Sequence, residues 1–314
     1  RAYYVARGRS VQRRRSGPRG AFDFSVTMTV PNLEVVEATG DAHVDLVTHL
    51  GEMFAVHPGR PDGCFARRAQ RRQLLRIRTP EEQRTGAASV SAALEDFDGD
   101  GLADLALTKV SGGLTDMKTE IRLFRGEKGG GFATPPRQRF ETEGFGAFSE
   151  YEDIDGDGQV EMVQPRAEVS ILGLTKILLS SSVSLDVLIR ERSADGDRFF
   201  DPEPVQILET SFGLDFSQPS GLLGAVPVFG HDFDADGRPD ALLSKGRDEM
   251  GLHRGQAGEV IFEDDAPYAI EGEGSYAAFV VEPGPGRRPE LLVWYPNRRG
   301  LDATFLIHRS TVPG

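Results

Sequence analysis

The sequence predicts an all-β fold, a β-propeller of four-stranded blades, and three observations support this prediction. An acidic nine-residue segment occurs three times, starting at Asp96, Asp153 and Asp232, and weaker copies lie before and after these three. Short apolar segments follow the copies, and 37 glycines and 19 prolines among 314 residues indicate frequent turns. Copies spaced about 50 to 60 residues apart fit blades of four short strands. Since such repeats pack against their neighbours, we expect residues 1–314 to form a single β-propeller domain.

The first part of the chain predicts one strand and one incomplete repeat. Tyr3–Gly8 is a short strand that ends in glycine, but no acidic segment precedes it, so we expect the sequence to start inside a blade. Glu37–Val47 keeps the frame of the acidic segment without an acid at the third position or a glycine at the sixth. It predicts a turn that has lost its ion, followed by a strand at Met53–Val56.

Each of the three complete copies predicts a calcium-binding loop. Acids occupy the first, third, fifth and ninth positions, and glycine occupies the sixth position, at Gly101, Gly158 and Gly237. Calcium takes six to eight oxygen ligands from carboxylates and carbonyl groups on a flexible frame. Glycine can adopt a positive φ, which lets the chain curl around the ion.

The predicted ligands are the side chains at positions one, three, five and nine and the backbone carbonyl at position seven. They are Asp96, Asp98, Asp100, Leu102 and Asp104; Asp153, Asp155, Asp157, Gln159 and Glu161; and Asp232, Asp234, Asp236, Arg238 and Asp240. A solvated turn is the alternative for any single segment rich in Asp and Gly. Three copies favour calcium, because crowded carboxylates repel one another unless a cation lies among them. We therefore expect three Ca²⁺ ions, one in each loop.

The loops differ from EF-hands in how they end. An EF-hand loop closes with Glu at its twelfth position, where this chain has Leu107, Gln164 and Leu243. Apolar residues follow the ninth position instead, so each loop is expected to lead into a buried strand. These strands contain Leu105–Leu107, Met162–Val163 and Ala241–Leu243.

A second landmark is an apolar strand that ends in glycine and is followed by a Gly-rich turn and a phenylalanine. The three examples are Met53–Val56 with Gly59 and Phe65, Ile121–Gly126 with Phe132, and Leu252–Gly255 with Phe262. Near the end of the chain, Glu282–Leu292 keeps acids only at its ends and predicts another turn without an ion. The aromatic pair Trp294 and Tyr295 follows at the place of a core strand, so we expect it to pack in the core rather than to stack on a sugar.

The long interval between the second and third loops predicts a helix at residues 167–182. Its apolar residues are spaced as on one face of a helix. The segment is too short and too interrupted to span a membrane. We expect a helical insertion in a blade that caps the fold, with docking of a partner as the alternative.

The loops and the strand–glycine–phenylalanine pattern resemble the FG-GAP/VCBS repeats of integrin-α-type seven-bladed propellers, over nearly the whole chain. The resemblance implies ion-binding loops at one edge of each blade, with adhesion or ligand display as function. It supports a ligand role for twelve acids: Asp96, Asp98, Asp100, Asp104, Asp153, Asp155, Asp157, Glu161, Asp232, Asp234, Asp236 and Asp240. About five repeats are visible, so we expect either further blades before Arg1 or a smaller or open assembly.

The composition of the chain indicates which kinds of partner it binds and in which compartment the protein is located. The formal net charge is −13, and part of this acidity belongs to the loops. Arginines cluster in two regions, but a solvated strand face explains them better than a patch for nucleic acid or an anionic glycan does. They are Arg13, Arg14, Arg15 and Arg19, and Arg67, Arg68, Arg71, Arg72, Arg76 and Arg78. The single Cys64 excludes an internal disulfide, and no run of eighteen apolar residues predicts a membrane span. Because extracellular modules bind calcium only at about 10⁻⁴ to 10⁻³ M, the loops favour an exported or cell-surface protein.

No catalytic motif stands out. The six histidines show no metal-binding spacing, and the chain lacks a Gly-x-Ser-x-Gly nucleophile motif and a phosphate-binding glycine loop. We therefore expect a non-catalytic calcium-binding propeller that binds a protein or glycan. The alternatives are a carbohydrate-active lyase or hydrolase with its site over the central channel, and a purely structural module of a larger chain.

Overall fold

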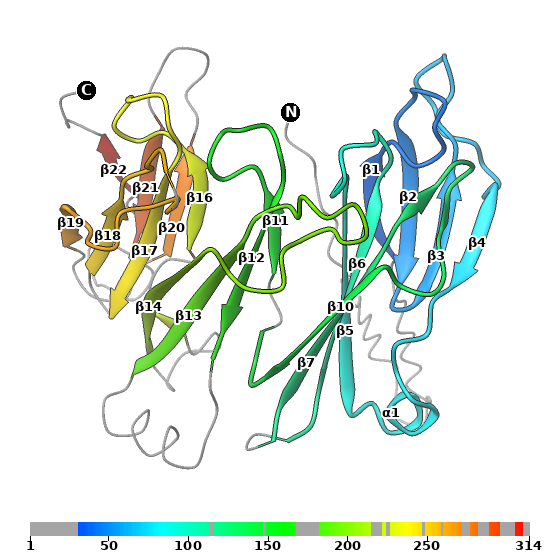
Figure 1. Cartoon of the computed structure of the whole chain (residues 1–314), viewed down its shortest axis with the longest axis horizontal. Helices are drawn as coiled ribbons and strands as arrows, with labels where there is room; N and C mark the ends of the chain where they lie inside the picture. Colours follow the sequence, from blue (N-terminus) through cyan, green and yellow to red (C-terminus); the bar gives the residue numbers. More distant parts are fainter. Residues whose placement is uncertain are drawn as a thin grey trace, which may run out of the picture. The chain divides into compact units, whose positions relative to one another are not determined.

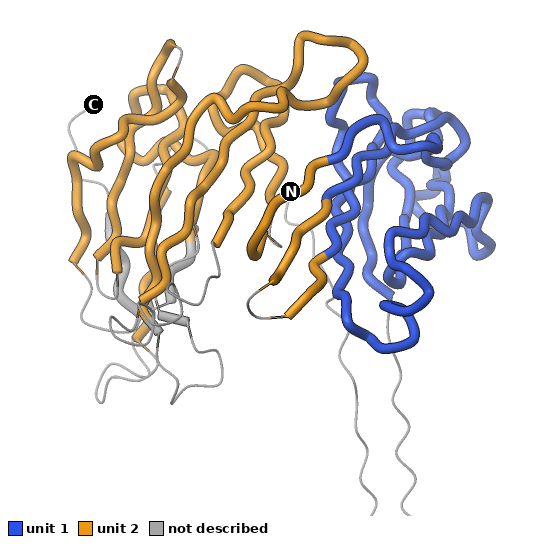
Figure 2. Tube along the Cα trace, turned by 60° about the horizontal axis from the view of Figure 1, so that its bottom comes forward, with its two compact units in different colours: residues 1–109, 121–139 blue, residues 110–120, 140–314 orange. Residues whose placement is uncertain are grey.

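The computed structural model describes residues 31–113, 116–146, 149–167, 182–214, 222–223, 227–246, 249–258, 260–271, 277–281, 289–295 and 305–309. This part of the chain contains 22 strands and one short helix, so the prediction of an all-β fold is confirmed (Figure 1). The chain divides into two compact units, one formed by Arg1–Lys109 and Ile121–Arg139 and the other by Val110–Glu120 and Phe140–Gly314 (Figure 2).

Two four-stranded sheets contain the first strands. One sheet has the order β1-β2-β3-β4, with antiparallel pairs throughout. Its strands are β1 (Asn32–Val36), β2 (Asp45–Leu50), β3 (Met53–His57) and β4 (Arg71–Leu74). The other sheet has the order β10-β7-β6-β5. Its strands are β5 (Ala88–Glu95), β6 (Asp104–Ser111), β7 (Lys118–Phe124) and β10 (Gln138–Glu143), and the short pair β8 (Gly126–Glu127) and β9 (Gly131–Phe132) lies between β7 and β10 in sequence.

The next two sets of strands share one nine-stranded sheet. The first set is β11 (Glu150–Glu152), β12 (Glu161–Arg166), β13 (Ser182–Arg190) and β14 (Gln206–Leu214), with β15 (Leu222–Leu223) paired to β14. The second set is β16 (Val228–His231), β17 (Asp240–Gly246), β18 (Glu249–His253) and β19 (Tyr268–Glu271). Two residue pairs of β14 and β17, which run parallel, join the sets into one sheet. A separate sheet holds β20 (Ala277–Val281), β21 (Glu290–Trp294) and β22 (Phe305–Arg309).

The strand pairing reveals five repeats, each with its acidic loop or loop relic between the first two strands. The loops join β1 to β2, β5 to β6, β11 to β12, β16 to β17 and β20 to β21. Each predicted strand after a complete loop is present as β6, β12 or β17 and carries a run of buried side chains. The twelfth-position residues Leu107, Gln164 and Leu243 are buried within these strands, as expected for a loop that is not an EF-hand.

Each unit has its own hydrophobic core. In the first unit, Val47 and Phe54 of one sheet belong to the same buried cluster as Leu105, Leu107 and Phe124 of the next. Two clusters form the cores of the second unit, one around Val163, Ile189 and Phe262 and the other around Leu242, Val293 and Tyr295. Tyr295 is only 1% exposed, which confirms its expected place in the core.

The strand–glycine–phenylalanine pattern corresponds to a β-bridge in each case. Gly59 pairs with Phe65, Gly126 with Phe132 and Gly255 with Phe262. The glycine is required by close packing, since a Cβ at Gly126 would lie 2.5 Å from the carbonyl oxygen of Ala103. The third repeat has the same bridge between Arg192 and Phe200, which the sequence pattern did not reveal because the glycine is absent.

A glutamine links consecutive repeats within each unit. The side chain of Gln73 in β4 donates to the carbonyl oxygen of Phe132 at 2.8 Å and accepts from its amide at 2.9 Å. Gln206 in β14 makes the same two bonds with Phe262, at 2.7 and 2.9 Å. Both glutamines therefore satisfy the backbone of a buried bridge phenylalanine that belongs to the following repeat.

The helix of the described chain is α1 (Pro80–Thr85), which the sequence analysis missed. Thr79 and Glu82 form a capping box around it, and Gly86 ends it in the left-handed conformation at φ 70°. Nearly all of the predicted helix at residues 167–182, the strand Tyr3–Gly8 and residues 282–288 of the last repeat lie outside the described residues. Among the described residues, no helix is long and apolar enough to cross a membrane.

Candidate metal centres in three acidic loops

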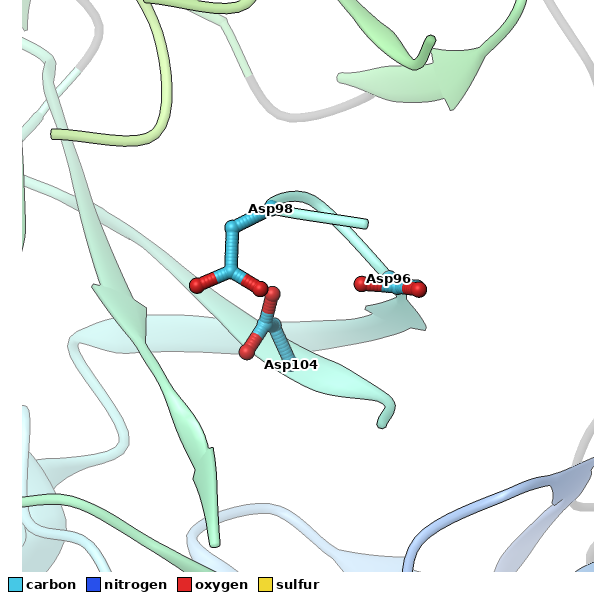
Figure 3. Close-up of side chains that lie close together, drawn as sticks. All are labelled: Asp96, Asp98 and Asp104. Atoms are coloured by element: carbon cyan, nitrogen blue, oxygen red, sulfur yellow. The ribbon is translucent and has the colours of Figure 1, made fainter. Parts of the chain in front are cut away.

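Three carboxylates converge in the first complete loop. Asp96, Asp98 and Asp104 each offer an oxygen, and these three atoms lie within 4.8 Å of one another. Figure 3 shows the carboxylates of Asp98 and Asp104 facing each other, with Asp96 across the loop. The second and third loops bring together the same three positions: Asp153, Asp155 and Glu161, and Asp232, Asp234 and Asp240.

The first acid of each loop shapes the turn. Asp96 accepts hydrogen bonds from the amides of Asp100 and Gly101, at 3.1 and 2.8 Å. The sixth-position glycines Gly101, Gly158 and Gly237 have φ of 85°, 86° and 91°, which confirms that the curl of the loop uses positive φ. In the second and third loops, Asp153 and Asp232 accept from the amides of these glycines at 3.1 and 3.0 Å.

The acids at position five of each loop are not members of the three-carboxylate groups. Asp100, Asp157 and Asp236 each accept a hydrogen bond from the amide of the residue at position seven. The distances are 2.9 Å to Leu102, 2.7 Å to Gln159 and 2.9 Å to Arg238. Nine of the twelve predicted carboxylates are thus brought together. The ligand role of the three fifth acids, and of the carbonyl groups of Leu102, Gln159 and Arg238, stays a prediction.

The ninth acid has a second, structural role. Asp104 is fully buried, and it accepts hydrogen bonds from the amides of Phe97 at 2.9 Å and Gly126 at 2.7 Å. Asp240 does the same with Phe233 at 2.8 Å and Gly255 at 3.0 Å. This acid therefore joins the start of its loop to a bridge glycine. The glycine follows β7 in the case of Asp104 and β18 in the case of Asp240.

Burial and like charge act against ionisation of the ninth acids. Burial, with the nearby carboxylates of Asp98 and Asp100, raises the pKa of Asp104 to about 7. Burial together with its loop neighbours raises the pKa of Glu161 to about 8. Burial, with Asp234 nearby, raises the pKa of Asp240 to about 6. A bound cation would favour the ionised carboxylates, so the electrostatics fit a metal site.

Arginines contact the first and third loops, a feature that the sequence analysis missed. Arg125 lies 3.2 Å from Asp98 and 2.9 Å from Asp100, and Arg137 lies 2.5 Å from Asp98. In the third loop, Arg254 lies 2.6 Å from Asp234 and 3.7 Å from Asp236. Arg125 and Arg254 both directly precede a bridge glycine, so the recurring Arg-Gly pair was the signal available in the sequence.

Beside the second loop, an acid takes the position that Arg125 and Arg254 have beside the other two loops. Met162 pairs with Arg190, which puts Glu191 beside Glu161; in the next set Ala241 pairs with His253, which puts Arg254 beside Asp240. Burial, and then repulsion by Asp155, Asp201 and Asp157, raises the pKa of Glu191.

The donor set suits a hard divalent cation. All nine grouped side chains are carboxylates, and calcium selects such oxygen ligands over nitrogen or sulfur. In a calcium-bound state, the first, third and ninth acids of each loop would hold the ion.

Comparison with known proteins supports the repeat assignment. Residues 96–163, which contain the first two complete loops, match the family model of the FG-GAP-like repeat. This match confirms the predicted FG-GAP repeats in that part of the chain. The search of the curated proteins found no match. A similar solved structure, titled "Crystal structure of BBS1N in complex with ARL6DN, soaked with lead", is 12% identical, with 99% of this chain and 84% of that chain covered and a TM-score of 0.41.

Proposed function

We propose that this chain is a calcium-binding, non-catalytic repeat protein in which three ions stabilise the acidic loops. The observation that carries the proposal is the convergence of three carboxylates at equivalent positions of three successive repeats. Two of these groups lie within the segment that matches the FG-GAP-like repeat. Isolated acidic turns would not require the same three positions to converge each time.

Calcium is the ion that best fits the site chemistry. The raised pKa values of Asp104, Glu161 and Asp240 mean that ionisation of these buried acids is unfavourable in the metal-free protein. A divalent cation would offset the repulsion and leave the backbone hydrogen bonds of the ninth acids in place. Magnesium is a weaker candidate, because it requires near-ideal octahedral geometry and usually keeps several waters.

A propeller is the architecture that these repeats support. Each repeat starts with a strand, passes through the loop and continues into an antiparallel neighbour, as blades do. The glutamine bonds of Gln73 and Gln206 join one repeat to the next. Seven blades in a closed ring, or a smaller open assembly, are the two forms of this proposal.

The proposed setting is outside the cytoplasm, with a protein or glycan as ligand. FG-GAP repeats are typical of extracellular proteins, where calcium is abundant enough to occupy weak sites. Cys64 is exposed, and the sequence offers no second cysteine for an internal disulfide. Calcium in the loops would take the stabilising role that disulfides have in many secreted folds.

Thermal unfolding with and without calcium tests the metal-binding function. The protein is stripped with EDTA, and melting curves are recorded with CaCl₂, with MgCl₂ and with EDTA. We expect calcium to raise Tm by several degrees, more than magnesium does, and we expect the triple variant D98N/D155N/D234N to lose most of this gain. Equal melting temperatures in calcium and EDTA for the wild-type protein would overturn the proposal.

A further inference from the structure

The three loops differ in the charge that faces them. The residue beside the ninth acid is Arg125 in the first loop, Glu191 in the second and Arg254 in the third. Strand register shows that Glu191 and Arg254 occupy equivalent positions in their repeats. Arg125 occupies the equivalent position because the next residue, Gly126, donates a hydrogen bond to Asp104, as Gly255 does to Asp240. One repeat thus carries a negative charge where its two counterparts carry a positive charge.

The arginines partly neutralise their loops. Arg254 contacts the fully buried Asp234, one of the three converging acids of the third loop, at 2.6 Å. Two arginines, Arg125 and Arg137, contact Asp98 in the first loop. A cation that binds these carboxylates must compete with guanidinium groups already there or be repelled by them. Cation affinity is therefore reduced in both loops, most strongly in the first.

The second loop has no such counter-charge within the described residues. Neither Asp153, Asp155 nor Asp157 forms an ion pair with a described arginine or lysine, and Glu191 lies close enough to repel Asp155 and Asp157. The negative charge of Glu191 adds to the attraction that the four acids of this loop exert on a cation.

Glu161 provides a second observation that points to a ligand in this loop. It is 2% exposed, and one of its oxygens accepts a hydrogen bond from the amide of Ile154 at 2.9 Å. No other hydrogen bond to this carboxylate is present in the described part of the chain, whereas both oxygens of Asp104 and Asp240 accept backbone bonds. A buried carboxylate with one oxygen free of protein donors, and grouped with Asp153 and Asp155, is suited to bind a cation.

We infer that the loop Asp153–Glu161 is the tightest calcium site of the chain because the charge of Glu191 strengthens it, whereas Arg125 and Arg254 weaken the other two sites. This inference rests on the proposed calcium-binding function. It predicts an order of affinity in which the second loop binds first, the third loop binds next and the first loop binds last.

Calorimetric titration of the EDTA-stripped full chain with CaCl₂ tests this order. We expect one tight site and two weaker sites in the wild-type protein. Glu191→Gln is expected to weaken the tight site about tenfold, and Arg254→Gln to strengthen one weak site by a similar factor, as loss of one nearby charge implies. Glu209→Gln removes an exposed charge from β14 of the same sheet and should leave all affinities unchanged.

The outcomes separate this inference from the function on which it rests. If the wild-type protein binds no calcium, the proposed function fails. If three sites bind and respond to D98N, D155N and D234N, but Glu191→Gln and Arg254→Gln titrate like the wild-type protein, only the inference fails. Glu191→Gln is nearly isosteric, and circular dichroism establishes that each variant is folded before titration. Should Glu191→Gln fail to fold, Arg254→Gln and Arg125→Gln test the same charge argument in the other two loops.

Discussion

Asp45 accepts a hydrogen bond from the backbone amide of Gly59 at 2.8 Å, although Asp45 closes a loop that lacks the acid at its third position. Asp104 makes the same bond with Gly126 and Asp240 makes it with Gly255. The other oxygen of Asp45 accepts from the amides of Ala38 and Thr39. The ninth acid therefore organises the backbone of a repeat whether or not its loop holds a full set of acids.

Asp45→Ala should destabilise the first unit without changing its response to calcium. The substitution leaves three buried or partly buried amides without their acceptor, which implies a loss of about 1–3 kcal/mol in the free energy of unfolding. Chemical denaturation in EDTA and in calcium measures the loss, and it should be equal in the two conditions. Asp41→Ala, an exposed position in the same loop, is the matched control. A loss confined to the calcium condition would show that this loop still binds an ion.

Stability in EDTA should fall as pH rises from about 5 to 8. The pKa values of Asp104, Glu161 and Asp240 in the folded protein, about 7, 8 and 6, lie above their ordinary values. The folded state then binds more protons than the unfolded state, so the contribution of these groups is complete below about pH 4 and is lost as pH rises through the folded pKa.

Calcium should flatten this pH dependence, because the ion favours the ionised carboxylates. Melting temperatures across the pH range, with EDTA or with CaCl₂, provide the measurement. Glu161→Gln removes the group with the highest of the three pKa values and should reduce the slope in EDTA. A melting temperature in EDTA that rises steadily from pH 5 to 8 would contradict the assignment of raised pKa values to these acids.

Gln206→Ala should weaken the packing between two repeats of the second unit. The buried glutamine satisfies both the amide and the carbonyl oxygen of Phe262, which is itself fully buried. Truncation leaves two buried polar groups without their partner and opens a cavity, so we expect a loss of about 2–4 kcal/mol in the free energy of unfolding. Gln256→Ala, at an exposed position, should cost little. Equal effects of the two substitutions would contradict the proposed role of Gln206.

Ala42→Gly should stabilise the protein. Ala42 occupies the sixth position of the incomplete loop, where the complete loops have glycine, and its φ is 65°. A left-handed conformation costs a residue with a Cβ about 1–2 kcal/mol, and part of this cost is offset by the greater entropy of glycine in the unfolded chain. We expect a net gain of roughly 0.5 kcal/mol, measured by urea denaturation. Ala38→Gly, which removes a buried methyl group from the same loop, should instead be destabilising.

Local features of the fold were predictable from the sequence, and contacts between distant segments were not. The acidic loops, the strands after them and the glycine–phenylalanine bridges depend on residues that are close together in sequence, so their patterns recur visibly. Arg137 contacts Asp98, which is 39 residues away in the sequence, and Gln206 contacts Phe262, which is 56 residues away. Nothing near either residue marks the contact. The helix α1 differs from these contacts, because its capping signal in Thr79–Glu82 is local and predicts a helix start.

The two neighbouring acids of the third loop should differ in their effect on calcium binding. Asp234 is fully buried and belongs to the converging group of three carboxylates. Asp236 is not a member of that group and accepts a hydrogen bond from the amide of Arg238. Asp234→Asn should therefore remove much of the third loop's share of the calcium-induced rise in Tm, and Asp236→Asn should remove less.

Loss of Asp234 also deprives Arg254 of its nearest carboxylate, so the melting temperature of this variant in EDTA should change as well. The quantity to compare is thus the difference between the melting temperatures in calcium and in EDTA for each variant, rather than either value alone. The double variant D234N/R254Q separates the two effects, because it removes the ion pair and the ligand together. If its calcium response is smaller than that of R254Q alone, the carboxylate acts as a ligand; if these two responses are equal, Asp234 acts only as the partner of Arg254.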